Sequence, residues 1–140
     1  MTHGHGLAVL RILIGIFLLF EGIDKLPWLL DSSILAGRLA GYLASATPLN
    51  RPYLELMIPG IDVFARLVVL GELAAGLALI VGVLTRTAAA LSLVMVLNFH
   101  VASGAIFVYA FLTNGYGLPV VGSLLALALA ARKLPWSLRP

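Results

Sequence analysis

The stretch that decides the fold runs from Phe64 to Leu84 and reads FARLVVLGELAAGLALIVGVL, with only Arg66 and Glu72 breaking its apolar character. An α-helix rises ~1.5 Å per residue and the hydrocarbon core of a bilayer is ~30 Å thick, so this run predicts one membrane-spanning helix. Glu72 then lies near mid-depth, where an ionised carboxylate costs roughly 3 kcal/mol even on insertion scales. Because such an acid normally faces protein or a wet cavity, Glu72 is a candidate functional residue.

The composition of the whole chain indicates an integral membrane protein. Of its 140 residues, 61% are hydrophobic and 11% are charged, whereas soluble domains are roughly half apolar and a quarter charged. The absence of cysteine excludes thiol nucleophiles, iron–sulfur ligation and disulfides. The net charge of +3 comes from lysines and arginines spread along the chain, a pattern that reports membrane topology and gives no reason to expect a nucleic-acid partner.

Four apolar runs separated by turn signals predict an all-α membrane four-helix bundle in a single domain. The predicted spans lie near residues 7–26, 63–84, 87–112 and 117–133. The proline-rich segment at about 30–60 is predicted to lie outside the bilayer and to contain a short interfacial helix that Asp31 or Ser32 can cap. This segment either lids the bundle or ties the first two spans together.

An even number of spans puts both termini on one side of the membrane. That side, with the Arg86 turn, carries Arg11, Arg86, Arg132, Lys133 and Arg139, and the other side carries Lys25, Arg38, Arg51 and Arg66. The acids concentrate on the second side and the C-terminal tail is cationic. The positive-inside rule therefore predicts a multi-pass protein of the cell inner (plasma) membrane with both termini in the cytoplasm.

Charged and small residues of the first span recur at helical spacing. They are Arg11, Gly15, Leu18, Gly22 and Lys25. Steps of three and four place them on one face, and the glycines allow a neighbouring helix to approach closely. We expect Arg11, Lys25, Glu72 and Arg86 to point into the bundle or a partner interface, with snorkelling to the headgroups as the alternative for Arg11 and Arg86.

Two polar side chains are predicted at comparable depth on neighbouring spans. By helical rise, Glu72 lies ~12 Å and His100 ~18 Å from the same membrane edge. An acid and an imidazole there can share a proton, bind a quinone carbonyl or relay a proton. The alternative is that each only satisfies a neighbour in a packed bundle. No metal site is expected, and a bis-His haem would need a second intramembrane imidazole.

The residues that carry a resemblance are RILIGIFLLFEGIDKL, residues 11–26, and GELAAGLALIVGVLTRTAAALSL, residues 71–93. The second contains the pattern G-E-x-x-x-G-x-x-L-x-x-G-x-x-T-R. Together they resemble the DoxX-like family of small four-helix membrane proteins. The resemblance implies these signature positions: Arg11, Gly15, Gly22, Lys25, Gly71, Glu72, Gly76, Gly82 and Arg86. The family is similar to the DoxD membrane subunit of thiosulfate:quinone oxidoreductases, and other members are linked to membrane oxidoreductase complexes that handle sulfur compounds or oxidative stress.

Two functions follow as expectations. In the first, the chain is a DoxX-like subunit of a quinone-linked redox complex, in which Arg11, Glu72 and His100 line a site for a quinone or a small apolar ligand. No covalently bound cofactor is expected, and no catalytic residue is assigned. In the second, the chain is a non-catalytic accessory or assembly subunit that packs against a larger membrane complex. Other membrane subunits and the lipid bilayer are the expected partners under both interpretations.

Overall fold

The computed structural model describes residues 3–130 and 133–138, and every regular element in these ranges is helical. The helices are α1 (His3–Asp24), η1 (Leu26–Leu29), α2 (Ser33–Ala44), α3 (Arg51–Met57), η2 (Ile58–Gly60), α4 (Ile61–Val81), α5 (Thr85–Ala102), η3 (Ala105–Phe107), α6 (Ala110–Thr113) and α7 (Leu118–Leu129). Within the described ranges, three helices are long and apolar enough to cross a membrane: Gly4–Asp24, Arg51–Val81 and Thr85–Ala102. The all-α membrane fold is confirmed, and α7 is a shorter apolar helix.

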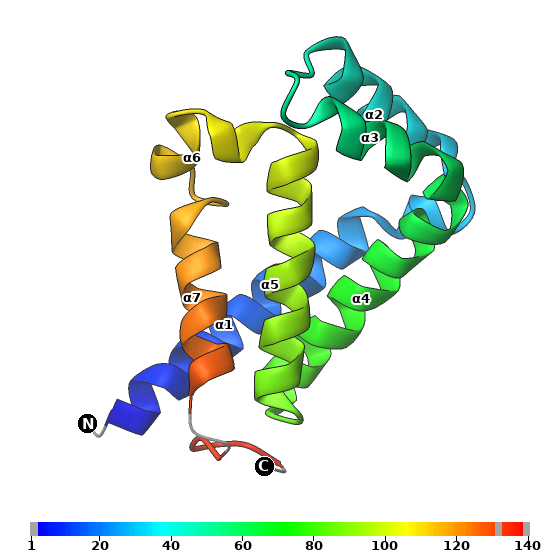
Figure 1. Cartoon of the computed structure of the whole chain (residues 1–140). Helices are drawn as coiled ribbons and strands as arrows, with labels where there is room; N and C mark the ends of the chain where they lie inside the picture. The colour runs from blue at the N-terminus through cyan, green and yellow to red at the C-terminus, as the bar shows by residue number, and fades with distance from the viewer. Residues whose placement is uncertain (1–2, 131–132, 139–140) are drawn as a thin grey trace.

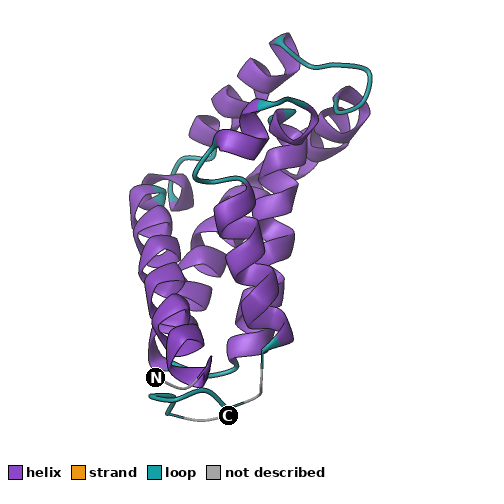
Figure 2. Cartoon of the chain, turned by 90° about the vertical axis from the view of Figure 1, so that its left-hand side faces the viewer, coloured by secondary structure: helices purple, strands orange, loops and turns teal. Residues whose placement is uncertain are grey.

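The two termini of the chain lie at the same end of the molecule (Figures 1 and 2). The α4–α5 turn and both chain ends lie at one end of the molecule, and α2, α3 and α6 lie at the other (Figures 1 and 2). Helix α7 runs beside α5 from the α6 end back toward the end that holds both termini (Figure 1). It is apolar but shorter than the three candidate spans, and because of it both termini lie at the same end. We refer below to the terminal end and the α2–α3 end of the molecule.

Glycines on both helices allow α1 and α4 to pack closely. A Cβ at Gly15 would lie 2.8 Å from the backbone nitrogen of Ile80 and 2.9 Å from the carbonyl oxygen of Gly76. A Cβ at Gly76 would lie 2.6 Å from the backbone nitrogen of Leu19. Neither position has space for a side chain. The backbones of α1 and α4 therefore lie in close contact, as is typical of small-residue motifs in membrane helices. The predicted inward face of the first span is confirmed, because Arg11, Leu18 and Lys25 are all buried.

The third predicted span, 87–112, is wrong in its second half. Helix α5 ends at Ala102 and is followed by Gly104 at φ 72°, a left-handed conformation that glycine adopts readily. The apolar run continues through short helices η3 and α6, so composition alone did not mark the break. A side chain at Gly104 would also meet Asn50, 3.1 Å from a Cβ there.

The other predicted bounds shift by a few residues. Helix α1 starts before residue 7 and ends before residue 26, where η1 begins, and α4 ends at Val81, before Gly82 at φ 80°. Helix α7 covers Leu118–Leu129, and residues 131–132 of the predicted fourth span lie outside the described residues, as does Arg139 of the topology argument. The 30–60 segment contains two helices, α2 and α3, rather than one.

Two apolar cores stabilise the molecule. One lies within the bundle and includes Ile14, Leu18, Leu79, Leu124 and Leu127. The other packs α2, α3 and η1 on the adjoining parts of α4 and α5, and includes Trp28, Leu35, Leu39, Leu54, Val69 and Ala102. The 30–60 segment is therefore a packed cap on the bundle.

Asn50 ties this cap to the end of α5. Its side-chain amide donates to the Ala102 carbonyl at 3.2 Å, and its side-chain oxygen accepts from the Thr47 backbone N–H at 2.9 Å and the Thr47 hydroxyl at 3.0 Å. Asn50 is 2% exposed. Because the last carbonyls of a helix lack intrahelical partners, this bond satisfies one of them and fixes the α2–α3 loop over the bundle.

Candidate functional site

A cavity of about 470 Å³ lies between α1, α4 and α5, under α2 and the loop before α7. One part of its wall is apolar and is formed by Phe17, Leu18, Val96, Phe99 and Val120. The other part carries ionisable side chains, namely Glu21, Asp24, Lys25, Arg38, Glu72 and His100. Glu72 and His100, predicted at comparable depth on neighbouring helices, thus line one cavity.

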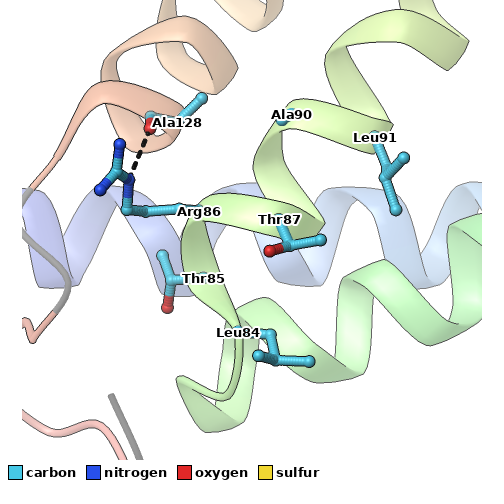
Figure 3. A pocket seen from close by; sticks show the side chains of 7 residues that line it. All are labelled: Leu84, Thr85, Arg86, Thr87, Ala90, Leu91 and Ala128. Carbon is cyan, nitrogen blue, oxygen red and sulfur yellow. Dashed lines mark hydrogen bonds between the residues drawn. The ribbon is translucent and has the colours of Figure 1, made fainter.

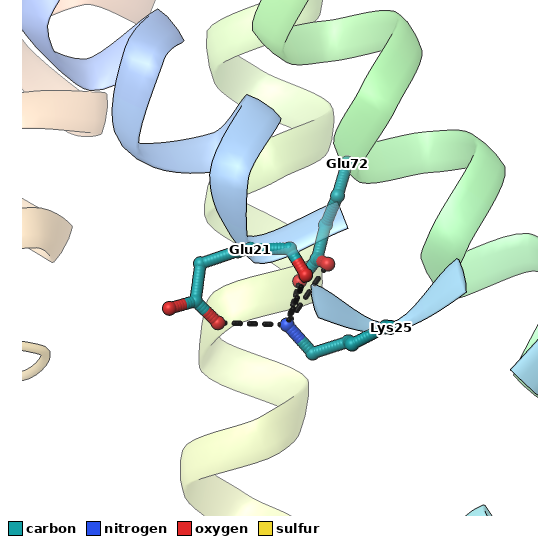
Figure 4. A network of polar contacts seen from close by, with 3 residues as sticks. All are labelled: Glu21, Lys25 and Glu72. Carbon is teal, nitrogen blue, oxygen red and sulfur yellow. Dashed lines mark hydrogen bonds and ion pairs between the residues drawn. The ribbon is translucent and has the colours of Figure 1, made fainter. Parts of the chain in front are cut away.

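Lys25 is the centre of the charged part of the wall (Figure 4). Its ammonium lies 2.7 Å from Glu21 Oε2, 2.9 Å from Glu72 Oε2 and 3.1 Å from Glu72 Oε1, and it also donates to the Glu21 backbone carbonyl at 3.1 Å. Lys25 and Glu72 are each 5% exposed. An ammonium has three donors, so these acceptors engage all of them. The Lys25–Glu72 pair links the end of α1 to α4 inside the bundle.

The geometry explains how an acid is tolerated at this depth. A buried charge is costly unless it is paired and hydrogen-bonded. Glu72 meets that condition through both carboxylate oxygens. Three carboxylates (Glu21, Asp24 and Glu72) and two cations (Lys25 and Arg38) line the cavity, so its formal charge is −1 when all are ionised.

His100 is held by the loop that precedes α7. Its Nε2 lies 2.8 Å from the Tyr116 carbonyl oxygen, and its ring packs edge-on against Phe111 at 4.9 Å between centroids. A carbonyl only accepts, so Nε2 carries the hydrogen, and in the neutral imidazole Nδ1 is left as an acceptor. The ring of Tyr116 in turn packs on Phe17 at 5.6 Å. The loop thereby fixes both the tautomer and the orientation of the imidazole.

Glu72 and His100 share the cavity without touching. In the described part of the chain, the ionic partner of Glu72 is Lys25, and the hydrogen-bond partner of the His100 ring is Tyr116. Both side chains line the cavity, together with apolar residues of α1, α5 and α7.

Arg11 lies away from this cavity, at the terminal end of the molecule. It is fully buried and donates to the Leu79 carbonyl at 2.7 Å, the Ile80 carbonyl at 3.3 Å and the Trp136 carbonyl at 3.0 Å. These bonds satisfy the C-terminal carbonyls of α4 and place a cation where the helix dipole favours one. A Cβ at Gly82 would collide with this guanidinium, which explains a glycine there. Arg11 therefore joins α4 to the C-terminal tail, and the structure does not bring it to Glu72 and His100.

Arg86 does not point into the bundle. It is exposed at the terminal end, where its Nε donates to the Ala128 carbonyl at 3.1 Å (Figure 3). The inward placement holds for Arg11, Lys25 and Glu72, whereas the exposed position of Arg86 agrees with the snorkelling alternative.

Sequence reasoning missed several cavity residues. Arg38 and Tyr42 reach it from α2, and Asn114 and Tyr116 from the loop before α7. Tyr42 reaches the cavity only because the cap folds over the bundle. The sequence TNGYG at residues 113–117 is typical of a turn, but it does not indicate that the Tyr116 carbonyl binds His100.

Comparison with known proteins gives one family. The DoxX family model matches residues 6–113, which is more than half of the chain and contains all the signature positions of α1, α4 and α5 described above. No significant match was found among curated proteins or among solved structures. The matched range includes α1, the α2–α3 cap, α4 and α5, and therefore most of the cavity wall. On this evidence the chain is a membrane protein that belongs to the DoxX family.

Proposed function

We propose that this protein is the membrane subunit of a quinone-linked redox complex, and that it binds the quinone ring in the cavity between Glu72 and His100. The observation that carries the proposal is the composition of the cavity wall, which combines an apolar side with ionisable groups from α1, α4 and α5. Ligand pockets are typically apolar with a few convergent polar groups, and a volume of about 470 Å³ is within their usual range.

Side chains suited to hold a quinone surround the space. The apolar wall, including Phe17 and Phe99, matches the ring face and the start of an isoprenoid tail. Arg38, Tyr42 and Asn114 also line the cavity and carry hydrogen-bond donors for the two quinone carbonyls. Arg38 lies 5.1 Å above the Trp28 ring, which positions its guanidinium at the α2 side of the cavity.

The ionisable groups are suited to supply protons. A quinone that takes up two electrons from a donor subunit of the complex also takes up two protons, one on each oxygen. Glu72 can supply one of these protons as a carboxylic acid and His100 the other as an imidazolium, after each has taken up a proton from water, and both residues line the cavity. General acid–base transfer requires such groups within hydrogen-bond reach of the oxygen they serve, directly or through one water.

A fluorescence titration tests this site. The chain has two tryptophans, and Trp28 is 2% exposed beside Arg38, so a Trp136→Phe background leaves one reporter near the cavity. A short-tailed benzoquinone or its reduced quinol, added to the purified protein in nanodiscs, should quench Trp28 saturably. The quinol hydroxyls donate to the Glu72 carboxylate and to Nδ1 of His100, so Glu72→Gln and His100→Gln should each weaken quinol binding about tenfold, since a hydrogen bond to a charged or polarised group contributes ~1.5 kcal/mol. Glu55→Gln changes an exposed carboxylate of α3 and should leave binding unchanged.

Two results would overturn the quinone site. One is an unsaturable quench in the wild type, and the other is equal affinity in the wild type and both cavity variants. If the wild type binds no quinone but co-purifies stoichiometrically with other membrane proteins, the accessory-subunit function replaces the proposal.

A further inference from the structure

A second hollow lies at the terminal end of the molecule, outside the cavity described above. A pocket of about 630 Å³ surrounds the α4–α5 turn and is lined by Arg86, Thr85, Thr87 and neighbouring apolar residues (Figure 3). It shares Leu84, Thr87 and Leu91 with an apolar groove of about 250 Å³ that continues along α4 and α5. The two hollows form one continuous surface, polar at the turn and apolar along the helices.

The polar end is suited to an anion. The N-cap of α5 is Leu84, which has no side-chain hydrogen bond to the helix, and the first turn of α5 contains no acid. The backbone N–H groups of this first turn therefore lack a capping acceptor, and the helix dipole adds partial positive charge. Arg86 contributes a full positive charge, and within the described residues only its Nε is hydrogen-bonded, to Ala128. Neither hollow is lined by an aspartate or glutamate.

The groove contains one buried polar atom that needs a partner. Ser92 lines the groove and is 1% exposed, and its Oγ has no hydrogen-bond partner in the described structure. A buried hydroxyl without a partner is destabilising, so an acceptor supplied by a ligand would stabilise this site. The rest of the groove is formed by small and apolar residues, including Gly71, Ala74 and Ala78.

We propose that this surface binds an anionic phospholipid, with the phosphate at Arg86 and the N-terminus of α5 and one acyl chain in the α4–α5 groove. Because α4 and α5 are membrane spans, their connecting turn lies at a membrane surface, the depth of lipid headgroups. Ser92 lies seven residues beyond Thr85, about two turns of α5, and so on the same face as the first residue of the helix, where its hydroxyl can donate to an acyl ester carbonyl. A docked apolar helix would leave the guanidinium and the uncapped N–H groups without a counter-charge, whereas a phospholipid supplies phosphate, carbonyl and hydrocarbon together.

Lipid retention measured by native mass spectrometry tests the proposal. The protein is equilibrated with equal amounts of phosphatidylglycerol and phosphatidylcholine. The wild type should retain phosphatidylglycerol preferentially, and Arg86→Gln should lower that preference about fivefold, the ratio equivalent to ~1 kcal/mol for one basic residue at an anionic surface. Ala74→Leu, which fills the groove without touching Arg86, should reduce retention of both lipids, and Ser92→Ala should weaken it to a smaller extent.

Matched controls and contrary outcomes are available in the same chain. Arg51→Gln removes an exposed arginine at the opposite end, and Ala126→Leu enlarges an exposed residue of α7 outside the groove, so both should retain lipid as the wild type does. An unchanged lipid preference in Arg86→Gln would overturn the proposal. So would displacement of the lipid by millimolar inorganic phosphate, which would indicate a site for the free anion. If Ala74→Leu abolishes self-association and leaves lipid retention unchanged, the groove is a protein interface instead.

Discussion

Lys25 and Arg11 show how one helix places two buried cations in different roles. Arg11 lies on the inward face of α1, and Lys25 directly follows Asp24, the last residue of α1; both are buried. The two terminal guanidinium nitrogens of Arg11 donate to backbone carbonyls of α4 and of the tail, while its buried Nε has no hydrogen-bond partner within the described residues, so Arg11 acts as a structural cap. Lys25 is satisfied mainly by carboxylates, which change their charge with protonation. Of the two cations, only Lys25 lies in a titratable cluster, and this cluster lines the cavity.

Removing the Lys25 ammonium should be strongly destabilising. Lys25→Met keeps the length of the side chain and leaves Glu72 buried without its ion-pair partner. Breaking a buried pair from one side costs ~3–5 kcal/mol, whereas removing both charges is far less costly. Lys25→Met should therefore unfold at clearly lower denaturant, and Lys25→Met/Glu72→Gln should recover most of the loss. Unfolding followed by Trp28 fluorescence measures both, and a double variant no more stable than the single one would show that the pair is not coupled.

At the scale of elements, the contact between α1 and α4 determines whether the cavity forms. Glycines at positions 15 and 76 face each other across it, with their Cβ positions each 2.9 Å from the other's carbonyl oxygen. This approach brings Lys25 within reach of Glu72 further along the same pair of helices. The small-residue face is thus a precondition of the ion pair and of the cavity wall.

Gly76→Ala should separate the two helices even though alanine favours helix formation. Its Cβ would lie 2.6 Å from the Leu19 backbone nitrogen, a contact that only movement of the backbone relieves. Overpacking of this kind costs ~1–3 kcal/mol. Gly122→Ala in α7 is the matched control, since nothing lies within 4 Å of its Cβ position, and it should be neutral or stabilising by up to ~1 kcal/mol. Thermal unfolding in one detergent compares them, and equal melting temperatures would refute the close-packing argument.

The cap begins with an acid whose titration should be measurable. Asp31 Oδ1 accepts from the Ser33 backbone N–H at 2.9 Å, so Asp31, rather than the N-cap residue Ser32, stabilises the start of α2. Ser32 instead donates its hydroxyl to Asp62 of α4. Hydrogen bonds from the Ser33 side chain and from its backbone N–H lower the pKa of Asp31.

The direction of this shift sets the pH dependence of the cap. Because the folded-state pKa lies below the unfolded value of ~3.9, the stabilisation is present above that value and is lost as the pH falls through the folded-state pKa. Amide exchange at the start of α2 should therefore accelerate in acid in the wild type. Asp31→Asn keeps an acceptor without a titrating group, so this acceleration should be weaker in the variant. Equal acceleration in both proteins would assign the acid sensitivity to another group.

Sequence periodicity predicted elements well where one face is buried and poorly where the chain turns within an apolar run. The spacing of Arg11, Leu18 and Lys25 predicted that they share one face. This prediction was reliable because a charged side chain in a membrane span must face protein rather than lipid. The end of α5 was missed because Gly104 is a single residue in a continuous apolar stretch, and its left-handed conformation is stabilised by distant contacts such as that of Asn50. The sequence left two placements open for Arg86 because the interior and the headgroup region both accommodate an arginine near a helix end.

At the scale of the whole molecule, the two ends differ in architecture. The α2–α3 end is closed by a cap with its own apolar core, and the cavity lies beneath it. The terminal end is held by Arg11 and the C-terminal tail, where the Leu138 N–H bonds to the Val81 carbonyl. Counting apolar runs was enough to predict that both termini lie at one end of the molecule. The cavity could not be predicted in this way, because it forms only where the cap, α1, α4, α5 and the loop before α7 meet in three dimensions.

The orientation in the membrane is the last prediction, and the absence of native cysteine makes it directly testable. We expect the terminal end in the cytoplasm, because basic residues favour that side and Arg86 is exposed there. Single cysteines at exposed positions report each end: Thr87→Cys at the α4–α5 turn, and Ser45→Cys and Gly115→Cys at the α2–α3 end.

In intact cells with a permeabilised outer envelope, a membrane-impermeant maleimide should label Ser45→Cys and Gly115→Cys. Thr87→Cys should react only after the inner membrane is lysed, and denatured samples of all three variants give the maximum labelling. The reverse pattern would place the termini outside the cytoplasm and would make the cavity open toward the cytoplasm. Labelling of Ser45→Cys and Gly115→Cys from opposite sides would contradict the fold itself, because the cap and the loop before α7 lie at one end of the molecule and together enclose the cavity that holds Glu72 and His100.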